Sequence, residues 1–356
     1  MKQIAVVTVS DVAFGGKGVA RHEGKVFFIP FTAPGDVVNV RVTRNKKKFA
    51  EAEALEIVTP SPDRVVPKCH WFGHCGGCAY QHIAYPAQLT LKHQQVEQTL
   101  RRVGQLNEVP MRPIIPSPEH YEYRNRIKVH VENRQVGFYA HASHELVPIS
   151  RCDIAKQGVN AVLHDLRRAG PRDGDYTLVA EAERGRFFEQ TNDAVAAELL
   201  SVVEALLPAA RELLVDAYCG AGFFAHRLAP KYTSVVGIEE NEFAIDHAKR
   251  AAAANERFIV GDVAEHLAAV LAPATPATTT VLLDPPATGL TPRVLDHILA
   301  SAPATVLYVS CNPSTLARDL AALIPTYRLK SVTPLDMFPQ TAEVEVVAEL
   351  VCTGNV

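Results

Sequence analysis

The chain has 356 residues, 47% of them hydrophobic and 21% charged, with a formal net charge of -3, a balance typical of a soluble globular protein with two or three domains. No apolar run approaches the ~20 residues that cross a bilayer, and residues 1–7 continue into a strand pattern instead of a signal peptide, so we expect a cytoplasmic protein. The small net charge means that any site for a polyanion must be a local patch, and seven unevenly spaced cysteines favour metal or catalytic use over a disulfide framework.

Residues 1–57 have the pattern of an all-β segment. Short β-rich runs at 4–9, 25–29, 36–43 and 49–57 are separated by glycine and proline turn signals, which predicts a small barrel of the OB kind. The segment carries nine basic and six acidic side chains. Its basic run, Arg-Asn-Lys-Lys-Lys at 44–48, either contacts phosphates or lies in a solvated loop.

A proline-containing link leads to a group of cysteines: Cys69, Cys75, Cys78 and, much later, Cys152. The two glycines between Cys75 and Cys78 allow the backbone to fold tightly around one metal centre. Four thiolates hold either a tetrahedral zinc or an iron-sulfur cluster, and spacing alone favours zinc. A radical enzyme is the alternative, although its usual CxxxCxxC loop differs from the CxxxxxCxxC spacing here; unused core thiols are another.

The next segment combines a helix with strands. Residues 86–104 show a helical pattern, and residues 125–131 and 136–139 alternate like strands. Arg124, Arg126 and Lys128 share one strand face. This basic face suits an RNA groove or, equally, a solvated surface.

The chain from 213 onward predicts a doubly wound sheet. A buried strand at 213–217 runs into a glycine-bearing turn and a helix, and further strands are expected at 235–239, 257–262, 279–284, 306–310, 327–334 and 344–352. Asp216 and Gly220 are placed to bind a cofactor at the turn, Glu239 to bind ribose hydroxyls and Asp262 to accept from an adenine amino group. The NAD alternative lacks the third glycine of GxGxxG.

Cys311 follows the strand at 306–310 and precedes a helical stretch at 314–320. The carboxyl edge of an α/β sheet is where ligands bind, so a nucleophile is expected at such a turn. The alternative is a small core residue, which is the role we expect for Cys219 and Cys352.

Several motifs resemble known families. Residues 16–21, 24–30 and 34–38 resemble the TRAM domain of RNA-modifying enzymes, which favours phosphate contact for the basic run. Residues 216–222, 284–286, 309–313 and 336–345 resemble, in order, the motifs of the RNA uracil-5-methyltransferases, which make 5-methyluridine in tRNA or 23S rRNA. The similarity covers nearly the whole chain.

This resemblance implies an α/β protein in three parts. Residues 1–57 form an OB-like TRAM RNA-binding barrel, 58–187 a small central α+β domain with a [4Fe-4S] cluster, and 188–356 a class I, Rossmann-like methyltransferase domain. The methyl donor is S-adenosylmethionine, and iron-sulfur replaces zinc as the metal expected on the four cysteines Cys69, Cys75, Cys78 and Cys152. The expected partner is structured RNA, either 23S rRNA or tRNA, with no membrane contact and a monomeric enzyme.

The resemblance also implies roles for single residues. Uracil C5 is a poor nucleophile, so the Cys311 thiolate first adds to C6 and Glu345 later removes the C5 proton. Gln190 and Asp284 hold the edge of the uracil, and Phe188 lines the pocket of the flipped base. The residues expected at the cofactor are Gln190, Asp216, Tyr218, Gly220, Glu239, Asp262 and Asp284.

Two positions depart from the family pattern. Ala287 stands where the family usually has an arginine, for which Arg293 is a possible substitute, and Glu343 stands where it often has histidine. Spacing alone leaves Glu343 open as the base, because it shares a strand face with Glu345. The missing arginine motivates a second hypothesis, an RNA-binding protein with a retained cofactor fold and weak or absent catalysis.

Overall fold

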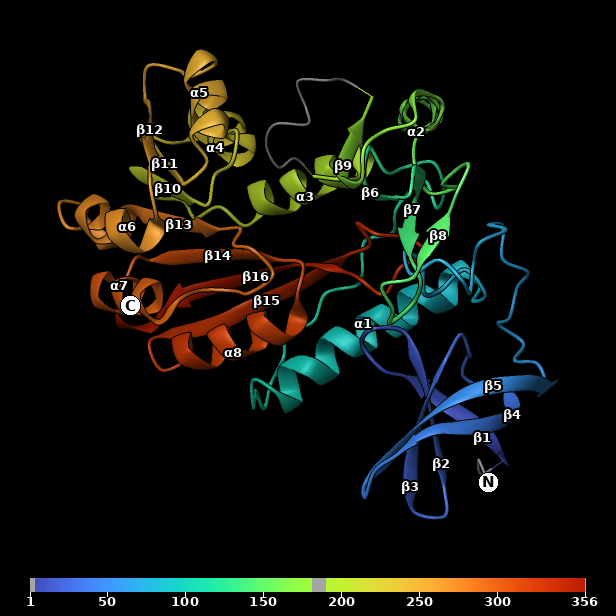
Figure 1. Ribbon diagram of the computed structural model, residues 1–356. Helices are drawn as coiled ribbons and strands as arrows, with labels where there is room; N and C mark the ends of the chain where they lie inside the picture. The colour runs from blue at the N-terminus through green and yellow to red at the C-terminus, as the bar shows by residue number, and fades with distance from the viewer. Residues whose placement is uncertain (1–3, 181–189, 356) are drawn as a thin grey trace. The chain divides into compact units, whose positions relative to one another are not determined.

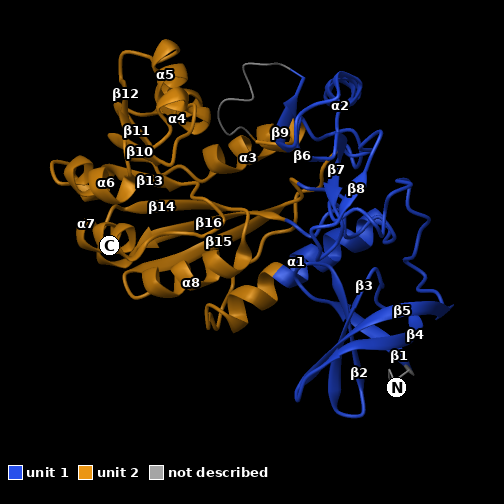
Figure 2. Ribbon diagram, in the orientation of Figure 1, with its two compact units in different colours: residues 1–95, 119–180, 338–343 blue, residues 96–118, 181–337, 344–356 orange. Residues whose placement is uncertain are grey.

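The computed structural model describes residues 4–180 and 190–355 and divides into two compact units (Figure 1, Figure 2). One unit comprises residues 1–95, 119–180 and 338–343, and the other comprises residues 96–118, 181–337 and 344–356. The boundary therefore passes through helix α1 (Tyr85–Arg102). The three-part division at 57 and 187 stays a prediction.

The first unit begins with the expected barrel. Five strands close in the order β1-β2-β3-β5-β4; their bounds are β1 Ile4–Val12, β2 Lys17–His22, β3 Lys25–Pro30, β4 Val37–Asn45 and β5 Phe49–Thr59. Alternate residues such as Val38 and Val40 point inward and are fully buried, as the period of two requires. Closure leaves no sheet edge exposed, and the prediction of a small OB-like barrel is confirmed.

A four-stranded sheet forms the second part of this unit, in the order β8-β7-β6-β9. Its strands are β6 Arg126–Glu132, β7 Gln135–Tyr139, β8 Leu146–Pro148 and β9 Gly174–Val179, with helix α2 Gln157–Ala169. Ile127, Val129 and Leu163 pack in its core. On the basic face, the Lys128 ammonium lies 2.7 Å from Asp175, so part of that charge is balanced within the sheet.

Residues 338–343 belong to the first unit because α1 and the chain after Cys78 hold them. Lys92 is fully buried and donates to the Phe338 carbonyl (2.9 Å), and Gln88 donates to the Gln340 side chain (3.0 Å). The backbone N–H groups of Ala79 and Tyr80 donate to the Gln340 carbonyl. This short segment is thus fixed by partners more than two hundred residues away in sequence.

The second unit is built on a seven-stranded sheet in the order β12-β11-β10-β13-β14-β16-β15. The strands are β10 Leu213–Ala217, β11 Ser234–Glu239, β12 Glu256–Val260, β13 Thr279–Leu283, β14 Thr305–Ser310, β15 Tyr327–Leu335 and β16 Glu345–Cys352. The pairs from β12 to β14 are parallel, whereas β16 runs antiparallel to both of its neighbours. The last two strands are therefore a hairpin and not a further strand-helix-strand repeat.

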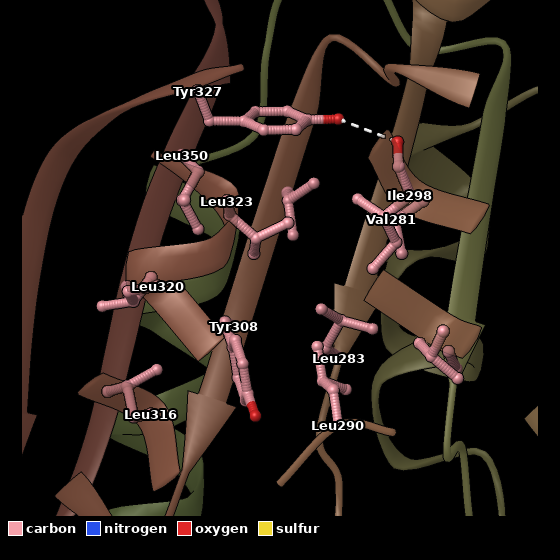
Figure 3. Close-up of a cluster of buried hydrophobic side chains, with 14 of the residues drawn as sticks. Val281, Leu283, Leu290, Ile298, Tyr308, Leu316, Leu320, Leu323, Tyr327 and Leu350 are labelled. Carbon is pink, nitrogen blue, oxygen red and sulfur yellow. Dashed lines mark hydrogen bonds between the residues drawn. The ribbon is translucent and has the colours of Figure 1, made fainter. Parts of the chain in front are cut away.

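Helices cover both faces of this sheet (Figure 1). They are α3 Asp193–Ala205, α4 Phe223–Leu228, α5 Glu242–Arg250, α6 Val263–Leu271, α7 Pro292–Ser301 and α8 Pro313–Leu323. On one face, α6, α7 and α8 join alternate strand residues in a single hydrophobic cluster, part of which Figure 3 shows around Tyr308 and Leu283. The prediction of a doubly wound sheet is confirmed. In the part of the chain that the structure describes, no helix is long and apolar enough to cross a membrane.

Candidate functional site

The glycine turn after β10 forms one part of the carboxyl edge of the sheet. Tyr218, Gly220 and Gly222 all have positive φ (68°, 51° and 86°), which glycine adopts without strain and other residues rarely do. Gly222 then caps α4, and a Cβ atom there would lie 2.5 Å from the His226 ring. The turn therefore brings bare backbone to the sheet edge, as a cofactor phosphate or carboxylate requires.

Two acids predicted at the cofactor follow the neighbouring strands. Glu239 ends β11 and accepts from the N–H groups of Gly220 (3.1 Å) and Asn241 (2.8 Å), so it ties the glycine turn to the next strand. Asp262 follows β12, is exposed, and caps α6 by accepting from the Ala264 N–H group (2.8 Å). The parallel register places both carboxylates at the same edge as Gly220.

Burial makes two further carboxyl groups of this edge unusually basic. Asp216 is fully buried, and this burial, reinforced by the charges of Asp284 and Glu239, raises its pKa to about 8, although the Ala225 N–H group donates to it (2.9 Å). Asp284 keeps part of its surface exposed, yet burial of its carboxyl group raises its pKa to about 7. Gln190 donates to Asp284 (3.2 Å), so the predicted partners are brought together. Both acids are poised to ionise beside a cationic ligand.

Cys311 and Glu345 lie at the ends of neighbouring strands on the other part of the edge. The antiparallel pairing of β14 with β16 sets Ser310 opposite Val346, so the next pair in the same register is Cys311 and Glu345. Residues opposite one another in such a pair have Cα atoms about 4.5–5.5 Å apart and side chains on one face. Cys311 is half-buried, whereas Glu345 is only 3% exposed. A thiol and a carboxyl group are therefore both present at the ends of these neighbouring strands.

The alternative acid lies elsewhere. Strand β16 begins at Glu345, so the expectation that Glu343 shares a strand face with it is wrong. Glu343 is exposed, and its N–H group donates to the Thr341 hydroxyl (3.2 Å) in the segment that belongs to the first unit. Phe188 lies outside the described residues. Cys219 and Cys352 are both 4% exposed, as expected for packing residues.

The loop after β13 carries Ala287, where a cation was expected. Ala287 is exposed, and its carbonyl accepts from Asn312 (3.0 Å) and Thr315 (3.1 Å) at the start of α8. Arg318 and the fully buried Asp319 also bind this loop, a pair that sequence reasoning missed. The polar residues Asn312, Thr315 and Arg318, spaced by three at the start of and along α8, were the signal that could have revealed the contact.

The four predicted metal-binding cysteines gather in the first unit. Cys78 lies near enough to Cys69, Cys75 and Cys152 for all three to affect its ionisation, and burial raises its pKa most. Burial also raises the pKa of Cys152 to about 11 and that of Cys75. Thiol ligands must lose a proton to bind metal, so burial opposes the thiolate form that a metal would require here.

Backbone donors surround these sulfur atoms. The N–H groups of Trp71, Gly77 and Ile154 donate to Cys69, Cys75 and Cys152 respectively, each from two residues further along the chain. Such donors favour thiolate and suit a sulfur-ligated centre. However, within residues 4–180 and 190–355 no three His, Cys, Asp or Glu side chains are placed to hold a metal ion.

Two family models match parts of the chain. The TRAM domain matches residues 3–55, and tRNA (uracil-5-)-methyltransferase matches residues 274–351. The second match spans β13 to β16 and includes Asp284, Cys311 and Glu345.

Relatives match over nearly their full length. Proteins named as uncharacterized RNA methyltransferases, from Thermosynechococcus vestitus and Bdellovibrio bacteriovorus, are 31% and 33% identical; the alignments cover 96% and 97% of this chain and 96% and 94% of the relatives. The crystal structure of the Pyrococcus abyssi tRNA (uracil-54, C5)-methyltransferase with S-adenosyl-L-homocysteine matches with a TM-score of 0.71 and 26% identity, over 98% of this chain and all of that one.

Proposed function

The chain belongs to a family of RNA methyltransferases, and from this premise we propose that it is a uracil-5-methyltransferase that methylates C5 of one uridine in a structured tRNA or rRNA, giving 5-methyluridine. It is an S-adenosylmethionine-dependent RNA methyltransferase. The observation that carries the proposed chemistry is the antiparallel pairing of β14 with β16, whose last pair, Ser310 and Val346, places Cys311 and Glu345 at neighbouring strand ends. Methylation at uracil C5 needs a nucleophile for C6 and a general base for the C5 proton within reach of the same ring.

Cys311 supplies the nucleophile in this proposal. Its thiolate adds to C6 of the uracil, and the electron pair of the C5–C6 double bond moves toward the O4 carbonyl, which makes C5 nucleophilic. S-adenosylmethionine supplies an electrophilic methyl group. C5 takes this methyl group as the sulfonium–methyl bond breaks, leaving S-adenosylhomocysteine. Cys311 is half-buried and lies after β14 and before Asn312, the N-cap of α8. This position leaves its sulfur accessible to the uracil ring.

Glu345 completes the proposed reaction. Its carboxylate takes the C5 proton, the C5–C6 double bond forms again, and the Cys311 thiolate leaves C6. Because Glu345 is buried at the start of β16, the proton is removed away from bulk water. Glu343 is exposed and precedes the strand, which supports Glu345 as the base.

The remaining predicted residues serve the two substrates. Glu239, Asp262 and the Gly220 turn suit the ribose, adenine and amino-acid parts of S-adenosylmethionine, and Asp216 and Tyr218 shape that turn. Asp284, fixed by Gln190, suits both the cationic cofactor and the polar edge of the uracil. Holding the base in this site requires flipping it out of its RNA stack.

The cysteine group is proposed to hold a [4Fe-4S] cluster. Three backbone N–H···S contacts support a sulfur-ligated centre, which would also require the thiols to move within reach of one cluster, since no three of them are so placed in the described residues. The cluster has no step in the proposed methyl transfer. Protein purified without oxygen should contain about four iron and four sulfide per chain; stoichiometric zinc without sulfide would contradict the cluster.

The function is tested with RNA that lacks the modification. Bulk unmodified tRNA and rRNA are incubated separately with the protein and methyl-labelled S-adenosylmethionine, and the RNA is digested to nucleosides. We expect label in 5-methyluridine from one of the two RNA classes and none with Cys311→Ala. Binding of both substrates without any 5-methyluridine would instead favour an RNA-binding protein without catalysis, to which the alanine at position 287 points.

A further inference from the structure

Helix α8 binds the loop at 284–290 with one row of side chains. Asn312 and Thr315 donate to the Ala287 carbonyl (3.0 and 3.1 Å), and Arg318 Nη2 donates to the carbonyls of Thr288 (3.0 Å) and Leu290 (3.2 Å). Side chains three residues apart lie on the same side of a helix. The helix that follows the Cys311 turn is therefore fastened to the loop that follows Asp284.

A buried carboxylate lies at the centre of this contact. Asp319 is 0% exposed, and Oδ2 accepts from the Leu290 N–H group (2.8 Å) and the Tyr308 hydroxyl (2.8 Å). Its Oδ1 atom accepts from Arg318 Nε (2.7 Å). An unpaired buried carboxylate would be costly, but three donors satisfy this one. Figure 3 shows Tyr308 and Leu290 in the same cluster as Leu316 of α8.

The loop backbone approaches this pair closely. Gly289 has φ +74°, and a Cβ atom there would lie 2.5 Å from Asp319 Oδ2 and 2.6 Å from Arg318 Nη2. Pro286, Ala287 and Thr288 are all exposed, so burial does not hold this stretch. The hydrogen bonds from α8 are what fix its path.

These contacts connect the two strand ends that carry the proposed chemistry. Strands β13 and β14 are neighbours, paired as far as Leu283 and Tyr308. Asp284 follows the first of these strands, and Cys311 follows the second. A loop that moved freely between them would let the uracil edge and its C6 atom drift relative to the sulfur. Errors of about 1 Å in such geometry cost about 10²-fold in rate.

We propose that Asp319 and Arg318 are positioning residues for thiolate addition: they fasten the 284–290 loop to α8 and so hold Asp284 and the Cys311 sulfur at a fixed separation. This inference rests on the proposed function. It also accounts for the cation missing at position 287. Arg318 supplies a guanidinium to the same loop from α8, with its side chain 53% exposed and directed by Asp319.

Two variants test the pair, with one control. Asp319→Asn keeps the shape but removes the charge that orients Arg318. Arg318→Lys keeps a cation, but a single ammonium cannot reproduce the guanidinium's separate contacts to Asp319 and to two carbonyls. Arg293→Ala is the control, because Arg293 is exposed on α7 and is the substitute cation considered from the sequence.

The main measurement is the single-turnover rate of covalent adduct formation with RNA containing 5-fluorouridine, in which fluorine blocks proton removal and preserves the Cys311 adduct. We expect both pair variants to lose about 10²-fold in this rate, with RNA KM nearly unchanged and Arg293→Ala at the wild-type rate. A wild-type rate in Arg318→Lys, or a loss confined to RNA KM, would overturn the positioning role and assign Arg318 to charge contact with RNA.

A second measurement is independent of activity. Hydrogen exchange followed by mass spectrometry reports the Leu290 amide, which donates to Asp319. We expect faster exchange at 286–290 in Asp319→Asn while β10 to β12 stay protected. Unchanged exchange there would overturn the inference even if methylation falls. Absence of adduct with the wild-type protein, together with faster loop exchange in the variant, would instead overturn the proposed function and leave the fastening intact.

Discussion

The two halves of the sheet's carboxyl edge hold their polar groups in different ways. In the half proposed to bind the cofactor (the cofactor half), after β10, β11 and β12, carboxylates accept from backbone N–H groups two to nineteen residues away: Asp262 from Ala264, Asp216 from Ala225 and Glu239 from Gly220. The other half, after β13 and β14, carries the proposed catalytic residues and is called the catalytic half. There, Gln190 donates to Asp284, 94 residues away in sequence. Side chains of α8 bind the 284–290 loop across sequence separations of 25 to 30 residues. Contacts between residues close in sequence can be predicted from a local motif, whereas contacts between distant residues depend on the tertiary fold.

The comparison predicts that replacing one side chain is enough to inactivate the catalytic half. Glu345→Gln removes the proposed base but keeps its shape, so turnover should fall by about 10²- to 10⁴-fold. The thiolate still adds and C5 is still methylated, so an RNA–protein adduct should accumulate on a denaturing gel.

The matched control is Glu343→Gln, at an exposed position two residues earlier. It should keep wild-type turnover and show no accumulated adduct. If Glu343→Gln were the inactive variant, the register argument for Glu345 would be wrong.

In the cofactor half, a change that disturbs the backbone of the glycine turn should instead reduce cofactor affinity. Gly222→Ala forces an alanine to φ +86° and places its Cβ atom 2.5 Å from His226, so S-adenosylmethionine affinity should fall by about tenfold or more, since strain of 1–2 kcal/mol is joined by a clash. Isothermal titration calorimetry measures the effect.

Gly24→Ala is the control for backbone strain alone, because Gly24 has φ +75° and nothing within 4 Å of an added Cβ atom. It should lower the melting temperature slightly and leave cofactor affinity unchanged. Equal cofactor affinity in the two variants would mean that the Gly222 turn does not contact the ligand.

One buried acid in each half predicts that cofactor affinity depends on pH. S-adenosylmethionine is cationic, so it favours the ionised forms of Asp284 and Asp216, whose pKa values burial raises to about 7 and about 8. Below pH 7 a proton must leave on binding; affinity should therefore fall with decreasing pH, by at most about tenfold per unit for each such proton. It should level off above pH 8.

Calorimetry in two buffers of different ionisation enthalpy counts the protons released. Release near pH 6.5 should lie between one and two protons, because both acids are mostly protonated there, and it should decrease by nearly one in Asp284→Asn. Binding that does not vary between pH 6 and 8.5 would show that neither acid senses the cofactor.

The smallest expected effect concerns Asp262, and it distinguishes the role of this residue as the α6 N-cap from its proposed contact with the cofactor. Asp262→Ala removes both the α6 cap and the carboxylate, and should cost about 1 kcal/mol of unfolding free energy. Asp262→Ser keeps a capping oxygen, so it should restore most of that stability in urea denaturation while cofactor affinity stays reduced. Full recovery of affinity in Asp262→Ser would restrict Asp262 to a structural role.

Local motifs were enough to propose the residues of the cofactor half, because each of these residues lies at or just after the end of a strand. The turn at 216–222 and the acids Glu239 and Asp262 each follow a strand, and parallel strands place such positions at one edge. The hairpin of β15 and β16 was not foreseen, because an apolar run does not state the direction in which its strand will pair.

Sequence patterns were enough to predict the barrel and the doubly wound sheet and to propose the site residues, since periodicity and glycine-bearing turns act over a few residues. The choice of Glu345 over Glu343 as the proposed base rests on the tertiary structure, because β16 begins at Glu345 beside the end of β14, whereas Glu343 is exposed and precedes the strand. The tertiary structure likewise revealed the contact of Asp319 and Arg318 with the loop at Ala287. A buried carboxylate chooses its partners by proximity in space, and no local pattern records that choice.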